Sequence, residues 1–162
     1  MTVESDLGSD RRLAARVASR AEIGDVRLFE ASIKLVDFPA SHVAMRYTVE
    51  MSPRVDYEPG SERFVVRTTY HVAIELAEAD DHAPAIASIE FELGGLFDLE
   101  ARTGDDGVSE AEFGAFARTT GQMALWPFAR EYIFDATGRL GLPPLAVGMF
   151  RIPLTASDVD HD

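Results

Sequence analysis

The stretch "LWPFAREYIFDATGRLGLPPL" (residues 125–145) carries the strongest helical pattern in the chain. At about 100° per residue its apolar side chains fall on one broad stripe, which predicts a helix docked on a core. The stripe consists of Leu125, Ala129, Tyr132, Ile133, Ala136 and Leu140. Pro127 suits the first turn of this helix, and Gly138 or Gly141 is expected to end it before Pro143 and Pro144.

Two phenylalanines, Phe128 and Phe134, fall outside this stripe. A small domain rarely leaves two such side chains on the solvent side of one helix, so the pattern predicts that something else covers them. The cover must come from elsewhere in the chain or from another copy of it.

The composition is that of one globular domain of 162 residues, 46% of them hydrophobic and 27% charged. No apolar run approaches the ~20 residues of a membrane span, and residues 1–10 do not have the pattern of an export signal. The absence of cysteine agrees with a reducing compartment, and we expect a cytoplasmic protein. Fifteen Lys and Arg against 28 Asp and Glu give a net charge of -13, which would repel a phosphate backbone. Nucleic acid and membrane insertion are therefore not expected.

The first part of the chain predicts a short helix followed by strands. The helix is expected over about 10–23, with Ser9 or Asp10 as its N-cap and Gly24 as its end. From residue 26 the period changes to two, which is typical of half-buried strands. Four strands are expected in "RLFEASIKLVDF" (27–38), "HVAMRYTVEM" (42–51), "ERFVVRTTYHVAIELA" (62–77) and "PAIASIEFELGGLFDLE" (84–100).

The segments between and after these strands complete the expected fold. "SPRVDYEPGS" (52–61) is interpreted as a polar linker, and the pair Gly94-Gly95 as a bulge or a close backbone approach. Ser109 and Glu112 have the spacing of a capping box, which predicts a helix from there to about Gly121. Strands first and helices last favour an α+β domain, with helices on one face of an antiparallel sheet.

No motif in the sequence indicates an enzyme. The four histidines never stand at i, i+4 on a helix, and no second ligand has a zinc-like spacing. No phosphate loop, dinucleotide fingerprint or nucleophile elbow occurs. We predict no catalytic residue, no metal and no cofactor. A small-ligand-binding protein that uses the cleft between sheet and helix stays open as an alternative.

Three segments together resemble the SecB family of export chaperones: "ELGGLFDLE", the stretch 125–145, and the apolar tail "AVGMFRIPL" (146–154). The matching positions are Gly95, Leu96, Phe97, Trp126, Pro127, Phe128, Ala129, Arg130, Glu131, Pro143, Pro144 and Leu145. With the preceding strands the resemblance covers about 26–154, which leaves 155–162 as an expected disordered tail.

The resemblance implies a four-stranded antiparallel sheet with C-terminal helices on one face. It also implies a dimer that continues the sheet, and a homotetramer in which the long helices lie between two sheets. Phe128 and Phe134 would then form an oligomer interface, covered by helices of neighbouring subunits. The alternative is that both pack under the C-terminal tail of a monomer.

The activity that the resemblance implies is ATP-independent binding of unfolded polypeptides in long apolar grooves. Flexible methionine and aromatic side chains suit a surface that adapts to many sequences. The candidate client-binding residues are Val26, Leu28, Phe38, Met45, Tyr47, Met51, Trp126, Leu142 and Met149.

Two partners distinguish the branches of the family. Export SecB docks the SecA motor through an acidic sheet surface; Leu76 and Glu78 match it, whereas Ile33 stands where a second acid is expected. The N-terminal helix and the sequence of the long helix are more similar to those of SecB-like chaperones associated with toxin–antitoxin systems. Those hold the C-terminal extension of an antitoxin. We therefore rank an antitoxin segment above general preproteins as the client, with delivery to SecA as the alternative.

Overall fold

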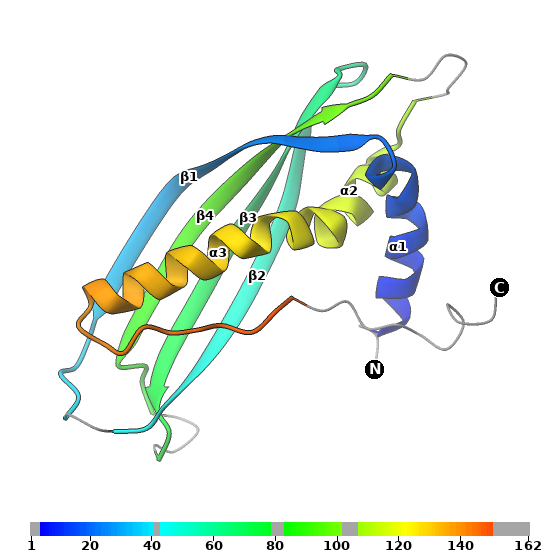
Figure 1. The fold of residues 1–162 in the computed structure, drawn as a ribbon. Helices are drawn as coiled ribbons and strands as arrows, with labels where there is room; N and C mark the ends of the chain where they lie inside the picture. Colours follow the sequence, from blue (N-terminus) through cyan, green and yellow to red (C-terminus); the bar gives the residue numbers. More distant parts are fainter. Residues whose placement is uncertain (1–3, 41–42, 79–82, 102–106, 151–162) are drawn as a thin grey trace.

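The computed structural model describes residues 4–40, 43–78, 83–101 and 107–150, and the side chains from residue 8 onward (Figure 1). Four strands form one antiparallel sheet in the order β1-β4-β3-β2, and the two C-terminal helices follow it in sequence. The expected α+β fold is confirmed. The elements are α1 (Glu4–Ala18), β1 (Ala21–Leu35), β2 (Met45–Tyr57), β3 (Arg63–Leu76), β4 (Ala87–Leu99), α2 (Glu110–Arg118) and α3 (Thr120–Arg139).

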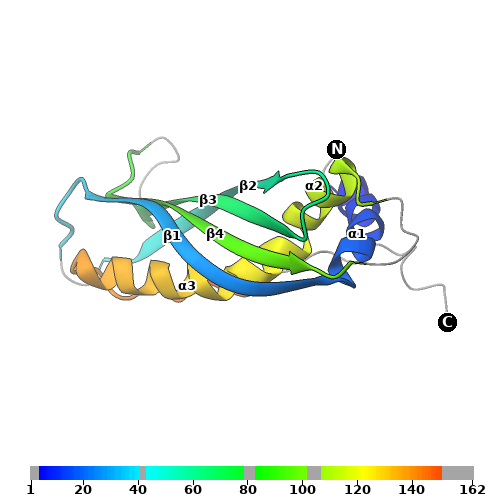
Figure 2. The same cartoon turned by 90° about the horizontal axis from the view of Figure 1, so that it is seen from above.

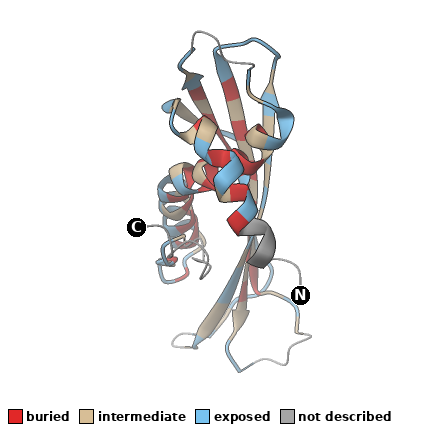
Figure 3. Cartoon of the chain, turned by 90° about the vertical axis from the view of Figure 1, so that its right-hand side faces the viewer, coloured by how far each residue is buried: buried red, intermediate tan, exposed pale blue. Residues whose placement is uncertain are grey.

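The described elements form two layers, because α3 lies along one face of the sheet and no described helix covers the other face (Figure 2). On β3 and β4 the residues that face the helices are buried and those that face away are partly exposed (Figure 3). This is the alternation that a half-covered antiparallel sheet requires. The helix-facing side of the sheet is therefore the apolar one.

The core has two parts along the sheet. One lies under α3 and is built around Tyr70, Phe91 and Ile133. The other lies where α1 and α2 meet the sheet and is built around Phe64, Phe97 and Phe116, whose rings contact one another. Leu125, at the start of α3, belongs to this second part.

The N-terminal helix differs from its expected range of 10–23. The structure begins α1 at Glu4 and ends it at Ala18, and residues 21–23 belong to β1. Two hydrogen bonds between Arg20 and Glu100 tie the chain to the end of β4, which draws Ala21 into a strand. Asp10, an expected N-cap, lies inside α1 and accepts two hydrogen bonds from Arg118, at 2.6 and 2.8 Å.

Strand β1 contains two register shifts that the sequence pattern did not indicate, and the second one displaces an aromatic side chain. The pairing with β4 shifts between Leu28 and Glu30, so Phe29 lies out of register. Its ring lies against Gly94 and under the guanidinium of Arg67, 4.0 Å from the ring centre. Gly94 and Gly95 stay in a continuous β4, so the close-approach interpretation is correct and the bulge lies in the partner strand.

The predicted linker 52–61 is largely strand. Strand β2 continues to Tyr57, and its residues pair with β3 as far as Phe64. Pro53 is tolerated there because β2 is an edge strand, where one side of the backbone has no ladder partner within the described sheet. Val55 and Tyr57 keep the helix-facing alternation and pack against the core.

Helix α2 begins as predicted, because Ser109 and Glu112 form the capping box. Helix α3, however, begins at Thr120, so Pro127 lies inside it rather than in its first turn. The residues before the proline stay helical because Gln122 and Leu125 are buried on the sheet, and Gln122 donates a 2.6 Å hydrogen bond to the Thr68 hydroxyl.

The end of α3 has the geometry of a Schellman motif. The N–H of Leu142 donates to the carbonyl of Thr137, and that of Gly141 to the carbonyl of Gly138. Gly141 adopts a φ of 75°, which favours glycine. The second of the two expected end points is therefore correct. Within the described part of the chain, no helix is long and apolar enough to cross a membrane.

Candidate functional site

The helix-facing side of β2 presents an apolar row at the sheet edge. Met45, Tyr47, Val49 and Met51 alternate with polar residues that point to the other face. Met45, Val49 and Met51 are half-buried against the core under α3, and Tyr47 is exposed. Three of the predicted client-binding residues, Met45, Tyr47 and Met51, therefore lie together on one strand.

Residues 141–150, called here the 141–150 segment, run back along α3 on the side of β2 (Figure 1). The segment has no helix or strand, and side chains of α3 bind its backbone. The indole N–H of Trp126 donates to the carbonyl of Gly148 and Nε of Arg130 to that of Val147, both at 2.8 Å. Nearer the turn, the N–H of Leu145 donates to the hydroxyl of Thr137 at 2.9 Å.

This arrangement buries two of the predicted client-binding residues. Trp126 is 8% exposed and Leu142 is 7% exposed, and both belong to the core under α3. Met149, near the end of the same segment, is 71% exposed. Met45, Tyr47, Leu142 and Leu145 line a small apolar hollow between β2 and the segment. The β2 row and the 141–150 segment together form a surface that we call the β2 groove.

The remaining candidates lie elsewhere. Val26 and Leu28 belong to β1, opposite Gly95 and Leu93, and so flank α3 on the side away from β2. Val26 is half-buried and Leu28 is exposed. The structure thus divides the strand candidates into two sets, one on each side of α3.

Phe38 lies in the connection between β1 and β2, and its side chain is 89% exposed. This connection crosses the end of the sheet, because β1 and β2 form its opposite edges. Its start is anchored by the N–H of Val36, which donates to the carbonyl of Ile86 at 2.8 Å. Phe38 therefore lies at the end of the sheet, between the two sets.

The proposed interface residues point away from their own sheet. Phe128 is 44% exposed and Phe134 is 51% exposed, on the side of α3 opposite its buried stripe. The 141–150 segment does not cover them, although the tail beyond residue 150 lies outside the described residues. The described residues thus leave two large apolar side chains of α3 exposed.

Of the positions related to SecA docking, Leu76 and Ile33 both face the helices, and only Glu78 is exposed. Leu76 and Glu78 lie at the end of β3, with Leu76 packed against the core and Glu78 exposed. Ile33 pairs with Ile89, so its side chain faces the helices. It contributes nothing to the polar face.

The face of the sheet without helices is held by ion pairs. Glu92 accepts from Arg67 and, at 2.6 Å, from Arg54. Burial raises the pKa of Glu92, but the hydrogen bonds and charges of Arg54 and Arg67 outweigh it, so the pKa lies below its ordinary value. His71 and Glu90 stand 3.6 Å apart on the same face. This polar face is poorly suited to an apolar chain.

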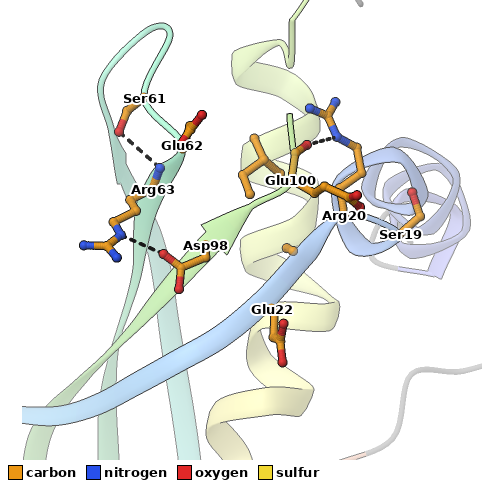
Figure 4. A pocket seen from close by; sticks show the side chains of 10 residues that line it. Ser19, Arg20, Glu22, Ser61, Glu62, Arg63, Asp98 and Glu100 are labelled. Carbon is orange, nitrogen blue, oxygen red and sulfur yellow. Dashed lines mark hydrogen bonds and ion pairs between the residues drawn. The ribbon is translucent and has the colours of Figure 1, made fainter. Parts of the chain in front are cut away.

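A second hollow, of about 810 Å³, lies beside the start of β1, the β2–β3 turn and the end of β4 (Figure 4). Both of its arginines are bound within the fold: Arg63 pairs with Asp98 at 2.7 Å, and Arg20 donates to the backbone carbonyl of Glu100. The space between α3 and the sheet is filled by buried side chains. Neither feature favours the small-ligand alternative.

The sequence patterns did not indicate Arg130, Thr137 and Val147 as parts of the site. All three take part in contacts between α3 and the 141–150 segment, which local sequence spacing does not reveal. In the sequence, Arg130 stands out only as one position of the SecB-like helix motif. The one sequence signal for this part of the site was the pair of prolines after Gly141. Two prolines exclude a helix and favour an extended chain after α3.

The chain belongs to the family of SecB-like chaperones. No family model matches it, but it is 37% identical over 157 residues to the SecB-like chaperone Rv1957 of Mycobacterium tuberculosis strain H37Rv. The match covers 91% of this chain and 87% of Rv1957, and MT2006 of strain CDC 1551 matches to the same extent.

A solved structure gives the same assignment. The M. tuberculosis Rv1957 chaperone, in complex with a ChAD peptide from the Rv1956 HigA1 antitoxin, superposes with a TM-score of 0.80. The match covers 88% of this chain and 99% of that one, at 37% identity. The resemblance inferred from the sequence is therefore confirmed, including its relation to the toxin–antitoxin branch of the family.

Proposed function

We propose that this SecB-like chaperone binds an unfolded segment of an antitoxin in apolar grooves beside α3, without nucleotide. The observation that carries the proposal is the relative Rv1957, whose structure contains an antitoxin peptide and which matches nearly the whole chain. We further propose that the protein acts in the cytoplasm as a homotetramer.

The β2 groove supports this proposal physically. Its exposed and half-exposed side chains are apolar and flexible, and burying each one against a client would yield roughly 1.5–3 kcal/mol before the client's ordering entropy is subtracted. Several must act together, so an extended client that spans Met45, Tyr47 and Met51 is favoured over a compact ligand. The net charge of -13 would attract basic clients and keep the apolar surface in solution.

The test uses the peptide that Rv1957 binds. We expect the ChAD peptide of HigA1 to bind the purified chain in titration calorimetry, and a scrambled peptide of the same composition to bind more weakly. The chain should also suppress the aggregation of a protein diluted from denaturant, in the absence of ATP. Failure to suppress aggregation together with failure to bind the peptide would contradict the proposal.

Delivery to SecA is the alternative role. Because Ile33 is not acidic and faces the helices, we expect weak or absent binding of SecA in titration calorimetry at moderate salt. Submicromolar affinity that is lost in Glu78→Lys would instead favour the export role.

A further inference from the structure

The 141–150 segment has the features of a bound client rather than of a secondary-structure element. Its backbone forms neither helix nor strand, and Leu142 and Val147 are buried against the core. Between them Pro143, Pro144 and Ala146 are exposed. A polypeptide segment bound in an apolar groove would show the same division, with a few anchoring side chains and the rest in solvent.

The hydrogen bonds of the segment do not depend on its sequence. Trp126 and Arg130 donate to main-chain carbonyls, and Thr137 accepts from a main-chain N–H. Every residue offers a carbonyl, and every residue except proline offers an N–H. Side chains of α3 that bind a backbone in this way can bind any extended chain that supplies apolar side chains at the right spacing.

The hold on the segment is also weak. Beyond the turn, three side-chain hydrogen bonds, two buried side chains and the partly buried Leu145 and Phe150 secure it, whereas β2 pairs with β3 along its whole length. Segments with few buried contacts and few hydrogen bonds open at lower free-energy cost than the core. The 141–150 segment is therefore the part of the β2 groove that can leave without unfolding the sheet.

We propose that the 141–150 segment is an internal pseudo-client. It covers the side of α3 next to the β2 row and leaves when an extended client binds. The backbone carbonyls of the client then accept from Trp126 and Arg130. This inference rests on the proposed function and deepens it. It also explains why two predicted client-binding residues are buried: Leu142 belongs to the pseudo-client, and Trp126 binds its backbone.

A reversible lock tests the proposal, since the chain contains no cysteine. The 2.9 Å hydrogen bond between Leu145 and Thr137 brings their backbones within the reach of a disulfide, whose Cα atoms lie less than about 7 Å apart. The double variant Thr137→Cys/Leu145→Cys fixes the segment when oxidised and frees it when reduced. The control is Thr48→Cys/Ala73→Cys, which joins directly opposite residues of β2 and β3 on the other face of the sheet.

The probe is reduced, carboxamidomethylated pancreatic trypsin inhibitor, a basic chain that stays unfolded, labelled for fluorescence anisotropy. We expect oxidation of the Thr137/Leu145 variant to weaken binding at least about tenfold, reduction to restore it, and the control to be unaffected. Equal binding by the oxidised and reduced forms would overturn the pseudo-client. If the wild-type protein does not bind the probe, the proposed function fails, and the pseudo-client fails with it.

Deuterium exchange of the wild-type protein gives a second measurement that needs no disulfide. With saturating probe, peptides that cover the 141–150 segment should exchange faster, while those from β3 should not change. Unchanged or slower exchange in the 141–150 segment would overturn the proposal.

Discussion

Glu112 links the start of α2 to α1. Its carboxylate accepts from the backbone N–H of Ser109 at 2.7 Å and from Arg16 at 3.3 Å. Burial raises the pKa of Glu112, but the hydrogen bonds from Ser109 and the contact with Arg16 outweigh it and leave the pKa below its ordinary value. The folded state therefore favours the ionised form of this residue.

We expect Glu112→Ala to lower the free energy of unfolding by about 1–2 kcal/mol near pH 7, because it removes a cap and an ion pair. A lowered pKa stabilises the fold above the unfolded value of about 4.3, and this contribution is lost as the pH falls through the folded pKa. The difference from wild type in urea unfolding should therefore shrink toward about pH 3. Glu110→Ala, also in the first turn, is the control and should cost less. An equal loss at both pH values would contradict this role.

Some residue roles could be predicted from the sequence and others could not. Ser109 and Glu112 are three residues apart, so their capping box follows from local spacing. Trp126 was expected in an exposed groove, yet its indole partner, the carbonyl of Gly148, is 22 residues away. Such a contact depends on how the chain returns after α3, which local periodicity does not contain.

Among the strands, one that pairs with a neighbour on each side was predicted better than the edge strands. Strand β3 lies between β4 and β2, and from Phe64 to Ile74 its buried residues alternate with half-buried or exposed ones. Strand β1 is an edge with bulges, so Phe29 does not share the face predicted from its spacing. Strand β2 and helix α3 extend through Pro53 and Pro127, because pairing and burial offset the local preference of proline to end such elements.

The junction of α2 and α3 is a tightly packed contact between elements. A Cβ atom on Gly121 would lie 3.1 Å from the carbonyl oxygen of Phe116 and 3.2 Å from Val66. A Cβ on Gly114, in the interior of α2, would meet only the flexible end of Arg118. The two glycines therefore differ in the space around them.

We expect Gly114→Ala to raise the free energy of unfolding by up to about 1 kcal/mol, since alanine is the better helix former. Gly121→Ala should instead lower it by about 1 kcal/mol or more, because the backbone of α2 must move. Thermal and urea unfolding measure both. A stabilising effect of Gly121→Ala would mean that the α2–α3 junction is looser than described.

For the molecule as a whole, the exposure of Phe128 and Phe134 on α3 favours the proposed tetramer. Light scattering at micromolar concentration should give a mass of about four chains, with dimers on dilution. Phe134→Glu should split the assembly, since an unpaired carboxylate in an apolar interface costs several kcal/mol. The control is Leu13→Glu, which makes the same change at an exposed apolar residue of α1. A monomeric wild-type protein would exclude this assembly.

At this level the sequence supported the fold and the family but not the layout of the site. The candidate residues were predicted as one group, whereas Leu28 and Tyr47 lie on opposite sides of α3. Their separation follows from the strand order β1-β4-β3-β2, in which the connection through Phe38 crosses the whole sheet. Strand order depends on pairing between distant segments, which the spacing of apolar residues does not reveal.

Binding of an unfolded chain to the double variant Phe38→Ser/Tyr47→Ser, and to each single variant, tests whether the client occupies an apolar groove. The control is Phe29→Ser, which removes an exposed aromatic side chain from the polar face. Circular dichroism and light scattering first establish that fold and assembly are unchanged.

We expect each single variant to weaken suppression of client aggregation modestly and the double variant to weaken it strongly, with Phe29→Ser like wild type. Wild-type binding should persist at about 1 M salt, where charge attraction is screened within a few ångströms. Wild-type stoichiometry in the double variant, or loss of wild-type binding at high salt, would contradict an apolar groove.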